Sequence, residues 1–156
     1  MTETLRDLMA RHHGPGRVAW IGLRPVRRAP MEIVDAATLG PDGLAGDHHP
    51  RPGKRAVTLI QGEHLAVISA LCGTEATPEL LRRNIVVTGI NLAALKGRDV
   101  TIGAARIALI GPCAPCSRME AALGPGGYSA MRHHGGWCAE AVFRGVIRVG
   151  DAVVPL

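Results

Sequence analysis

Aromatic side chains are scarce in this chain of 156 residues, at 3% of the total. Tyr and Phe each occur once and Trp twice, so a hydrophobic core must be built from Ala, Val, Ile and Leu. The shortage also leaves few rings on which nucleic-acid bases could stack. The arginines are scattered along the chain and form no single tract. Both features argue against nucleic acid as the partner.

Long hydrophobic runs are also missing, and we expect no secretory leader. No apolar run approaches the roughly 18 residues that a membrane helix needs. The N-terminus, MTETLRDLMARHHG, has two early acidic residues and no apolar h-region. Hydrophobic residues make up 47% and charged residues 20%, the balance of a folded protein. We therefore expect a cytoplasmic protein without a membrane partner, folded as one domain over residues 1–156 with its core at about 17–156.

Lysine is nearly absent, although the formal net charge is +5. Of the 18 basic residues, sixteen are Arg and only Lys54 and Lys96 are Lys. The planar fork of a guanidinium group suits phosphate and carboxylate, so the excess of Arg is compatible with an oxyanion ligand. A coding bias toward Arg would produce the same excess.

The four cysteines indicate free thiols and not a disulfide framework, because the chain shows no secretory signal. Cys72 lies on the apolar stripe of an expected helix, which predicts an inert position in the core. The other three fall in the last third of the chain, at Cys113, Cys116 and Cys138.

Glycine (20) and proline (11) divide the chain into short segments. Apolar β-branched segments between them predict strands at residues 17–23, 32–36, 56–60, 84–88, 100–102, 105–110, 139–143 and 146–149. Helical spacing predicts a helix over 63–72, ended by Gly73, and one helical turn at 92–95. Strands and long helices do not alternate, so a doubly wound α/β fold is unfavourable. The pattern predicts a mostly β fold, an antiparallel β-barrel or sandwich with a few peripheral helices.

The densest group of reactive residues is GPCAPCSRME at 111–120. Ser117 and Glu120 have the S-x-x-E spacing of a capping box, which predicts that Ser117 is the N-cap of a short helix. Cys116 would then lie just outside the helix, beside the positive end of its dipole and close to Arg118. Both favour the thiolate form. Such a thiolate suits a nucleophile, a persulfide carrier or a soft-metal ligand.

The C-x-x-C spacing by itself leaves three interpretations open. A redox dithiol of the thioredoxin kind needs a βαβ setting, which we do not expect here. A single functional thiol at Cys116, with Cys113 as an accessory, is the second. The third is structural zinc, whose candidate ligands are Cys113, Cys116, Cys138 and either His133 or His134.

Two further stretches are more polar than plain loops require. Asp47, His48 and His49 follow glycines just before the third expected strand. A neutral imidazole there could pass a proton or hold a ligand, and an adjacent acid could orient it. Alternatively, Asp47 only caps a turn.

The second stretch places Arg82, Arg83 and Asn84 at the entrance to a strand, with Asn91 shortly after that strand. Guanidinium and amide groups can hold a phosphate or a pterin-like ring. Strand alternation would put Arg82 and Asn84 on one face and Arg83 on the other. The alternative is a pair of solvated arginines.

Taken in order, these segments resemble the MOSC domain, the C-terminal domain of molybdenum cofactor sulfurases that also occurs in stand-alone bacterial relatives. The resemblance rests on GDH at 46–48, AVTLIQ at 56–61, RRNIVV at 82–87 and PC at 115–116. GGYSAMR at 126–132 and RVGD at 148–151 are also similar to the small bacterial members.

The resemblance implies a β-barrel with peripheral helices that binds the pyranopterin molybdenum cofactor. By its Pro-Cys context, Cys116 would be the sulfur carrier or the molybdenum ligand. The family's basic, amide-rich strand entrance corresponds to Arg82, Arg83 and Asn84, and we add Asn91 and Arg118 to the expected cofactor-binding set. Asp47 and His48 are the expected catalytic companions of Cys116, although the family turn is often Gly-Asp-Arg-His and this chain has Gly-Asp-His-His.

Two activities remain open under this resemblance. A sulfur carrier would need a sulfur donor and an acceptor molybdoenzyme, since the chain is too short to hold the pyridoxal-phosphate half of a sulfurase. A reductase of N-hydroxylated compounds, like the mitochondrial amidoxime-reducing component, would need an outside electron donor, because no flavin or iron–sulfur motif is evident. The alternative from another class is a non-catalytic binding module stabilised by thiols or zinc.

Overall fold

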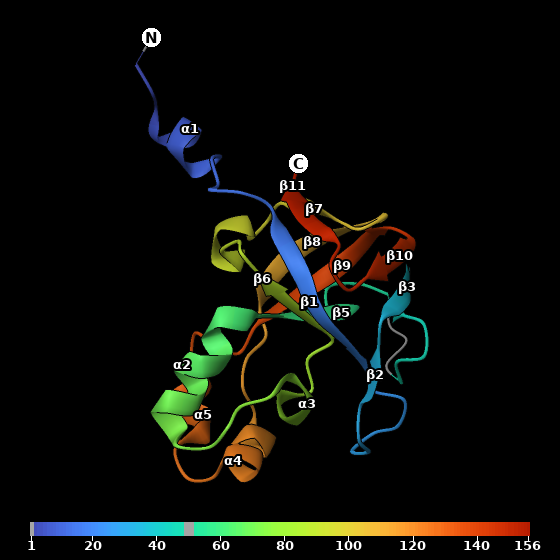
Figure 1. The fold of residues 1–156 in the computed structure, drawn as a ribbon, viewed down its shortest axis with the longest axis vertical. Coiled ribbons are helices and arrows are strands. Elements are labelled where there is room, and N and C mark those ends of the chain that lie inside the picture. The colour runs from blue at the N-terminus through green and yellow to red at the C-terminus, as the bar shows by residue number, and fades with distance from the viewer. Residues whose placement is uncertain (1, 49–51) are drawn as a thin grey trace.

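The computed structural model describes residues 2–48 and 52–156 of the chain, so His49 lies outside the described residues. Within them the chain forms a barrel of strands, a small second sheet and a group of short helices (Figure 1). No helix in the described part is long and apolar enough to cross a membrane.

Seven strands close the barrel. Their order is β11–β7–β8–β9–β5–β6–β1, and pairing of β1 with β11 completes the ring. The strands are β1 (Gly16–Leu23), β5 (Val57–Gln61), β6 (Ile85–Thr88), β7 (Asp99–Ile102), β8 (Ala105–Pro112), β9 (Trp137–Phe143) and β11 (Ala152–Pro155). β2 (Glu32–Val34) pairs with the last three residues of β1, and a separate sheet is formed by β10 (Gly145–Arg148), β3 (Ala36–Gly40) and β4 (Gly43–Leu44).

The barrel is mixed, which corrects the expectation of an antiparallel one. β5 and β6 run parallel, and the other strand pairs are antiparallel. Their connection holds α2 (Gly62–Cys72) and α3 (Pro78–Leu81), which return the chain to the end of the barrel where β5 began. The sequence patterns do not predict this β-α-β crossover. The C-x-x-C segment lies outside it, after β8.

Other expected elements are found with small shifts. The segment at 32–36 divides at Asp35 into β2 and β3, and the predicted turn at 92–95 is the 3-10 helix η1 (Leu92–Leu95). Gly73 ends α2 in the left-handed conformation, as expected. Five elements are not predicted by the sequence patterns: β4, β11, α3, α1 (Leu5–Met9) and α5 (Gly127–Met131).

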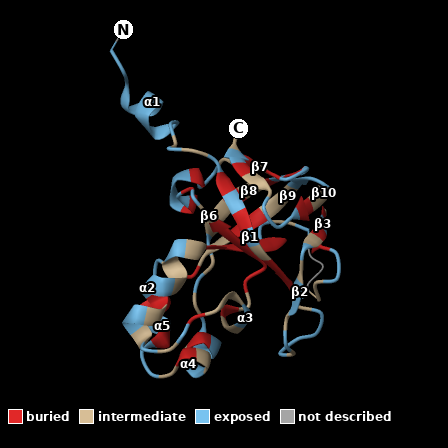
Figure 2. Ribbon diagram, in the orientation of Figure 1, coloured by how far each residue is buried: buried red, intermediate tan, exposed pale blue. Residues whose placement is uncertain are grey.

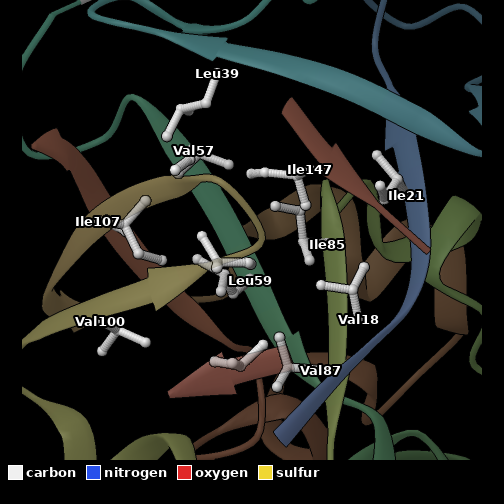
Figure 3. Close-up of a cluster of buried hydrophobic side chains, with 14 of the residues drawn as sticks. Val18, Ile21, Leu39, Val57, Leu59, Ile85, Val87, Val100, Ile107 and Ile147 are labelled. Carbon is white, nitrogen blue, oxygen red and sulfur yellow. The ribbon is translucent and has the colours of Figure 1, made fainter. Parts of the chain in front are cut away.

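Two layers of core account for the nearly continuous apolar sequence of β5 and β6. Side chains alternate between the two faces of a strand. Leu59 and Ile85 point into the barrel, with others labelled in Figure 3, whereas Ile60 and Val86 point outward under the helices. Both faces of these strands are therefore buried, and the second layer is completed by Ile68, Leu81, Met119, Leu123 and Met131.

The helices α2, α3, α4 (Ser117–Leu123) and α5 gather at one end of the barrel (Figure 1). In contrast, α1 extends away from it and is exposed throughout (Figure 2). The N-cap of α4 is Cys116 and not Ser117, so the predicted capping box is wrong. Glu120 instead accepts hydrogen bonds from the backbone N–H groups of Gly126 (2.6 Å) and Tyr128 (3.1 Å), at the start of α5.

Candidate functional site

The site begins with an ion pair between the residue that follows β1 and the turn that follows β4. The Arg24 guanidinium donates to both carboxylate oxygens of Asp47, from Nε to Oδ1 at 3.1 Å and from Nη2 to Oδ2 at 2.6 Å. The backbone N–H of Arg24 donates to the same Oδ1 at 2.7 Å. Burial would raise the pKa of Asp47, but the hydrogen bonds and charge of Arg24 outweigh it and hold the pKa below its ordinary value. Asp47 is therefore a carboxylate, fixed in one orientation.

Asn84, the residue directly before β6, connects this ion pair to strands β1 and β5. Its Oδ1 accepts from Thr58 (backbone N at 3.2 Å, hydroxyl at 3.1 Å) and from Arg24 Nη2 at 3.3 Å. Its Nδ2 donates to the Gly22 carbonyl at 3.0 Å and to Asp47 Oδ1 at 3.4 Å. Asn84 has no exposed surface, so its amide is already fully engaged with the protein. Asn84 therefore lies beside the predicted site residue Asp47 and links it to the buried backbone of the barrel.

His48 is fixed by the same segment after β1. Its Nδ1 lies 2.7 Å from the carbonyl oxygen of Arg24, and its backbone N–H donates to that oxygen as well. A carbonyl oxygen can only accept, so Nδ1 carries a proton, and in the neutral ring Nε2 is then the acceptor nitrogen. The structure thus brings His48 together with Asp47, both against Arg24.

A second arginine extends the positive charge around this pair. Arg82 adopts the left-handed conformation (φ 55°) at the end of α3, and its guanidinium donates to the carbonyls of Val26 and Ala29 in the loop between β1 and β2. Burial lowers the pKa of Arg82, and the positive charges of Arg24 and Arg118 lower it further, with Asp47 opposing them. Arg82 therefore lies within electrostatic reach of Arg118, which is exposed on the first turn of α4.

Arg83 and Asn91 lie elsewhere. Arg83 is 7% exposed and donates to the carbonyls of Gly135 (2.7 Å) and Leu81 (2.9 Å), which fixes the loop before β9. Asn91 caps η1, where its Oδ1 accepts from Ala93 N–H at 3.2 Å. It therefore lies at the opposite end of β6 from Arg82. The expected simple alternation of Arg82, Arg83 and Asn84 does not hold, because β6 begins only at residue 85.

Three of the four cysteines lie on or near the loop after β8. Cys116 is exposed at the N-cap of α4. Cys113 is half-buried and lines a cavity of about 430 Å³, together with Pro115, Arg132 and His133. Cys138, in β9, is buried. Cys116 thus follows a residue of the cavity wall and precedes Arg118 by two positions.

The zinc interpretation has no ligand set in the described ranges. No group of three or more His, Cys, Asp or Glu side chains gathers there as a metal site. His134 instead packs edge to face on His64, with ring centroids 4.9 Å apart. Cys72 is half-buried against the helical core layer, and its thiol donates to the Thr74 carbonyl at 3.4 Å.

Sequence reasoning missed Arg24 and Thr58. Arg24 is one of sixteen arginines, and its only local signal is its position directly after a strand. Thr58 lies in an apolar strand, where a buried hydroxyl needs a hydrogen-bond partner. Its hydroxyl donates to Asn84 Oδ1.

Fold and site together define a class of protein: a small closed β-barrel with arginine side chains, an ionised aspartate and a cysteine-bearing loop at one end of its strands. The family model of the MOSC domain matches residues 11–154. The chain belongs to the MOSC domain family.

Solved structures agree on the fold. The YUAD protein from Bacillus subtilis superposes with a TM-score of 0.79 at 17% identity, over 90% of this chain and 94% of that one. YiiM from Geobacillus stearothermophilus gives 0.75 at 18% identity, over 91% of this chain and 75% of its own. YiiM from Escherichia coli gives 0.69 at 18% identity, over 90% and 69%. No curated protein sequence matches the chain.

Proposed function

We propose that this protein binds the pyranopterin molybdenum cofactor, with its phosphate between Arg82 and Arg118 and its metal end toward Cys116. The observation that supports the proposal is the excess of positive charge around Arg82. Its guanidinium lies within electrostatic reach of two others, those of Arg24 and Arg118, and of one carboxylate, that of Asp47, which leaves two positive charges in excess. A phosphate monoester with nearly two negative charges fits that excess.

Within this proposal the residues around Asp47 have distinct roles. Arg82 and Arg118 bind the phosphate. Arg24 is already held by Asp47 on both oxygens, so it shapes the site and adds charge. Asn84, which is buried with its amide engaged, acts as a positioning residue for Arg24 and Asp47. Asn84 thus has a supporting role in the proposal, in place of the direct contact with the ligand that the sequence predicts.

Cys116 supplies the thiol of the proposed site. It is exposed, so a sulfur donor or a bound ligand can reach it. The bound cofactor would supply redox or sulfur-accepting chemistry at its metal. His48 would hold or donate a proton next to Asp47 in the turn after β4, with its ring oriented by the Arg24 carbonyl. Arg83 fixes the loop that precedes β9 and thereby one wall of the cavity beside Cys113.

Two activities fit this arrangement, and they differ in what Cys116 carries. A sulfur carrier needs a persulfide on Cys116, whereas a reductase of N-hydroxylated compounds needs Cys116 as a ligand of the metal. Cyanide-labile sulfur on Cys116 after incubation with a persulfide donor supports the first activity. Reduction of a small amidoxime by the loaded protein with an artificial electron donor supports the second.

The binding proposal is tested by replacing the phosphate ligands one at a time. A charge-assisted contact to phosphate contributes about 1.5–3 kcal/mol, so Arg82→Ala and Arg118→Ala should each weaken cofactor binding by about one to two decades. Arg106→Ala is the matched control, since Arg106 is exposed on β8 and no ion pair in the described chain uses it. Unchanged binding in both test variants would place the phosphate elsewhere.

A further inference from the structure

Cys113 and Cys138 are in contact across neighbouring strands. At the end of the β8–β9 ladder Gly111 lies opposite Cys138, and the backbone N–H of Cys113 donates to the Gly136 carbonyl at 2.8 Å. Cys113 is two residues beyond Gly111, so its side chain and that of Cys138 share one face of the ladder as diagonal neighbours. The Cys138 thiol donates a hydrogen bond to the Cys113 sulfur.

The two thiols differ in access. Cys113 is half-buried and opens onto the cavity of about 430 Å³ between β8, α5 and the loop before β9. Cys138 is 8% exposed and lies behind it. A small reagent in the cavity therefore meets Cys113 before it can meet Cys138.

They also differ in charge. The hydrogen bond from Cys138 lowers the pKa of Cys113 to about 6, with help from the charges of Arg83, Arg24 and Arg55 and against the effect of burial. The same hydrogen bond, with burial, raises the pKa of Cys138. Arg83 is buried and bound only to backbone carbonyls, and in the described part of the chain no carboxylate pairs with it. A thiolate on Cys113 supplies the negative charge that this guanidinium lacks.

We infer that Cys113 and Cys138 form a reactive dithiol, in which Cys113 attacks a small hydroperoxide that enters the cavity and Cys138 closes a disulfide between β8 and β9. The Cys113 thiolate attacks the terminal peroxide oxygen, an S–O bond forms and the O–O bond breaks. The second oxygen takes up a proton and leaves as water from hydrogen peroxide, or as an alcohol from an organic hydroperoxide. The Cys138 thiol then attacks the resulting sulfenic sulfur, the S–O bond breaks, and the hydroxyl leaves as water with the thiol proton. Two thiols lose two electrons in total, and one peroxide gains them.

This dithiol is independent of the proposed cofactor site, because neither thiol needs the cofactor for the reaction. It also gives the C-x-x-C motif a different pairing from the one its spacing suggests. The partner of Cys113 is Cys138, 25 positions later in the chain, and not Cys116. The disulfide would tie the loop that carries Cys116 to β9.

The experiment treats the reduced full chain with a small excess of hydrogen peroxide, blocks the remaining thiols with N-ethylmaleimide and digests with trypsin without reduction. Cleavage at arginines gives one peptide with Cys113 and Cys116 (107–118) and another with Cys138 (133–144). We expect these two peptides to be joined, with the loss of two hydrogen atoms, in the wild type, Cys116→Ser and the control Cys72→Ser. We expect no joined peptide in Cys113→Ser or in Cys138→Ala.

Two results would overturn the inference. A joined peptide that persists in Cys113→Ser would make Cys116 the partner of Cys138. Unjoined peptides in Cys116→Ser, with a stable sulfenic acid or free thiols, would show that Cys138 does not resolve Cys113. Cys113 is half-exposed, so its serine variant keeps the test decisive if replacement of the buried Cys138 prevents folding.

Discussion

Arg24 and Asp47 are joined by three hydrogen bonds in which Arg24 is always the donor and the Asp47 carboxylate always the acceptor. The two side chains are 14% and 3% exposed. An ion pair this well shielded from water is screened less by salt than a surface pair. The turn after β4 is thereby attached to the end of β1, and the carboxylate stays ionised in the folded protein.

Replacing Asp47 by Asn should remove an acid-dependent part of the stability. The folded pKa of Asp47 lies below its ordinary value of 3.8, so the unfolded chain takes up the proton first as the pH falls. The stability from this carboxylate is therefore full above the ordinary pKa and is lost as the pH falls through the folded pKa. Urea unfolding measured from about pH 6 to about pH 2 should show a smaller loss for Asp47→Asn than for the wild type.

Asp7→Asn is the matched control for this titration. Asp7 also has a lowered pKa, through hydrogen bonds from the backbone and side chain of Thr4, but it lies on the exposed helix α1. We expect its replacement to leave most of the acid dependence in place. An equal acid dependence in the wild type and in Asp47→Asn would contradict the account of the ion pair.

Glu120 should matter more for stability than Ser117, the reverse of the expectation from the S-x-x-E spacing. Glu120 accepts from the first N–H groups of α5, whose own N-cap, Gly126, has no side chain to do so. Loss of such a cap costs about 0.5–2 kcal/mol. Glu120→Ala should lower the free energy of unfolding in urea by that amount, and Ser117→Ala should change it little. A larger loss of unfolding free energy in Ser117→Ala than in Glu120→Ala would instead support a capping box at Ser117.

Local sequence patterns predict most strands of this fold but not their pairing. Ile85 and Val86 point to opposite faces of β6, and both faces are buried. Such an apolar segment predicts a strand, but it does not indicate which neighbouring strand pairs with it. The parallel pairing of β5 with β6 depends on where α2 packs, which no short window of sequence contains. A prediction that judges each connection by its turn residues therefore gives antiparallel strands throughout.

The candidate site was predictable where its residues are neighbours in the sequence. Asp47 and His48 are adjacent, and the structure holds both against Arg24. Arg24 lies 23 positions before Asp47, and Cys113 lies 25 positions before Cys138. Pairs at that separation form because the barrel closes, so composition and spacing give no sign of them.

Cys116 should be the cysteine that reacts fastest with small alkylating agents once the Cys113 thiol is removed. It is exposed, whereas Cys72 is half-buried with its thiol bonded to the Thr74 carbonyl. Peptide mapping of Cys113→Ser after brief treatment with iodoacetamide at neutral pH measures both rates. Preferential labelling of Cys72 would show that the loop after β8 shields Cys116.

Co-elution of metal and pterin tests most directly our proposal that the chain binds the molybdenum cofactor. The purified chain is incubated without oxygen with cofactor released from a molybdoenzyme, then separated by gel filtration. Molybdenum is measured by mass spectrometry and pterin by fluorescence after oxidation. We expect both to elute with the wild type in equal amounts and both to be much reduced with Arg82→Ala. A folded wild type that elutes without molybdenum or pterin, or with stoichiometric zinc in their place, would contradict the proposal.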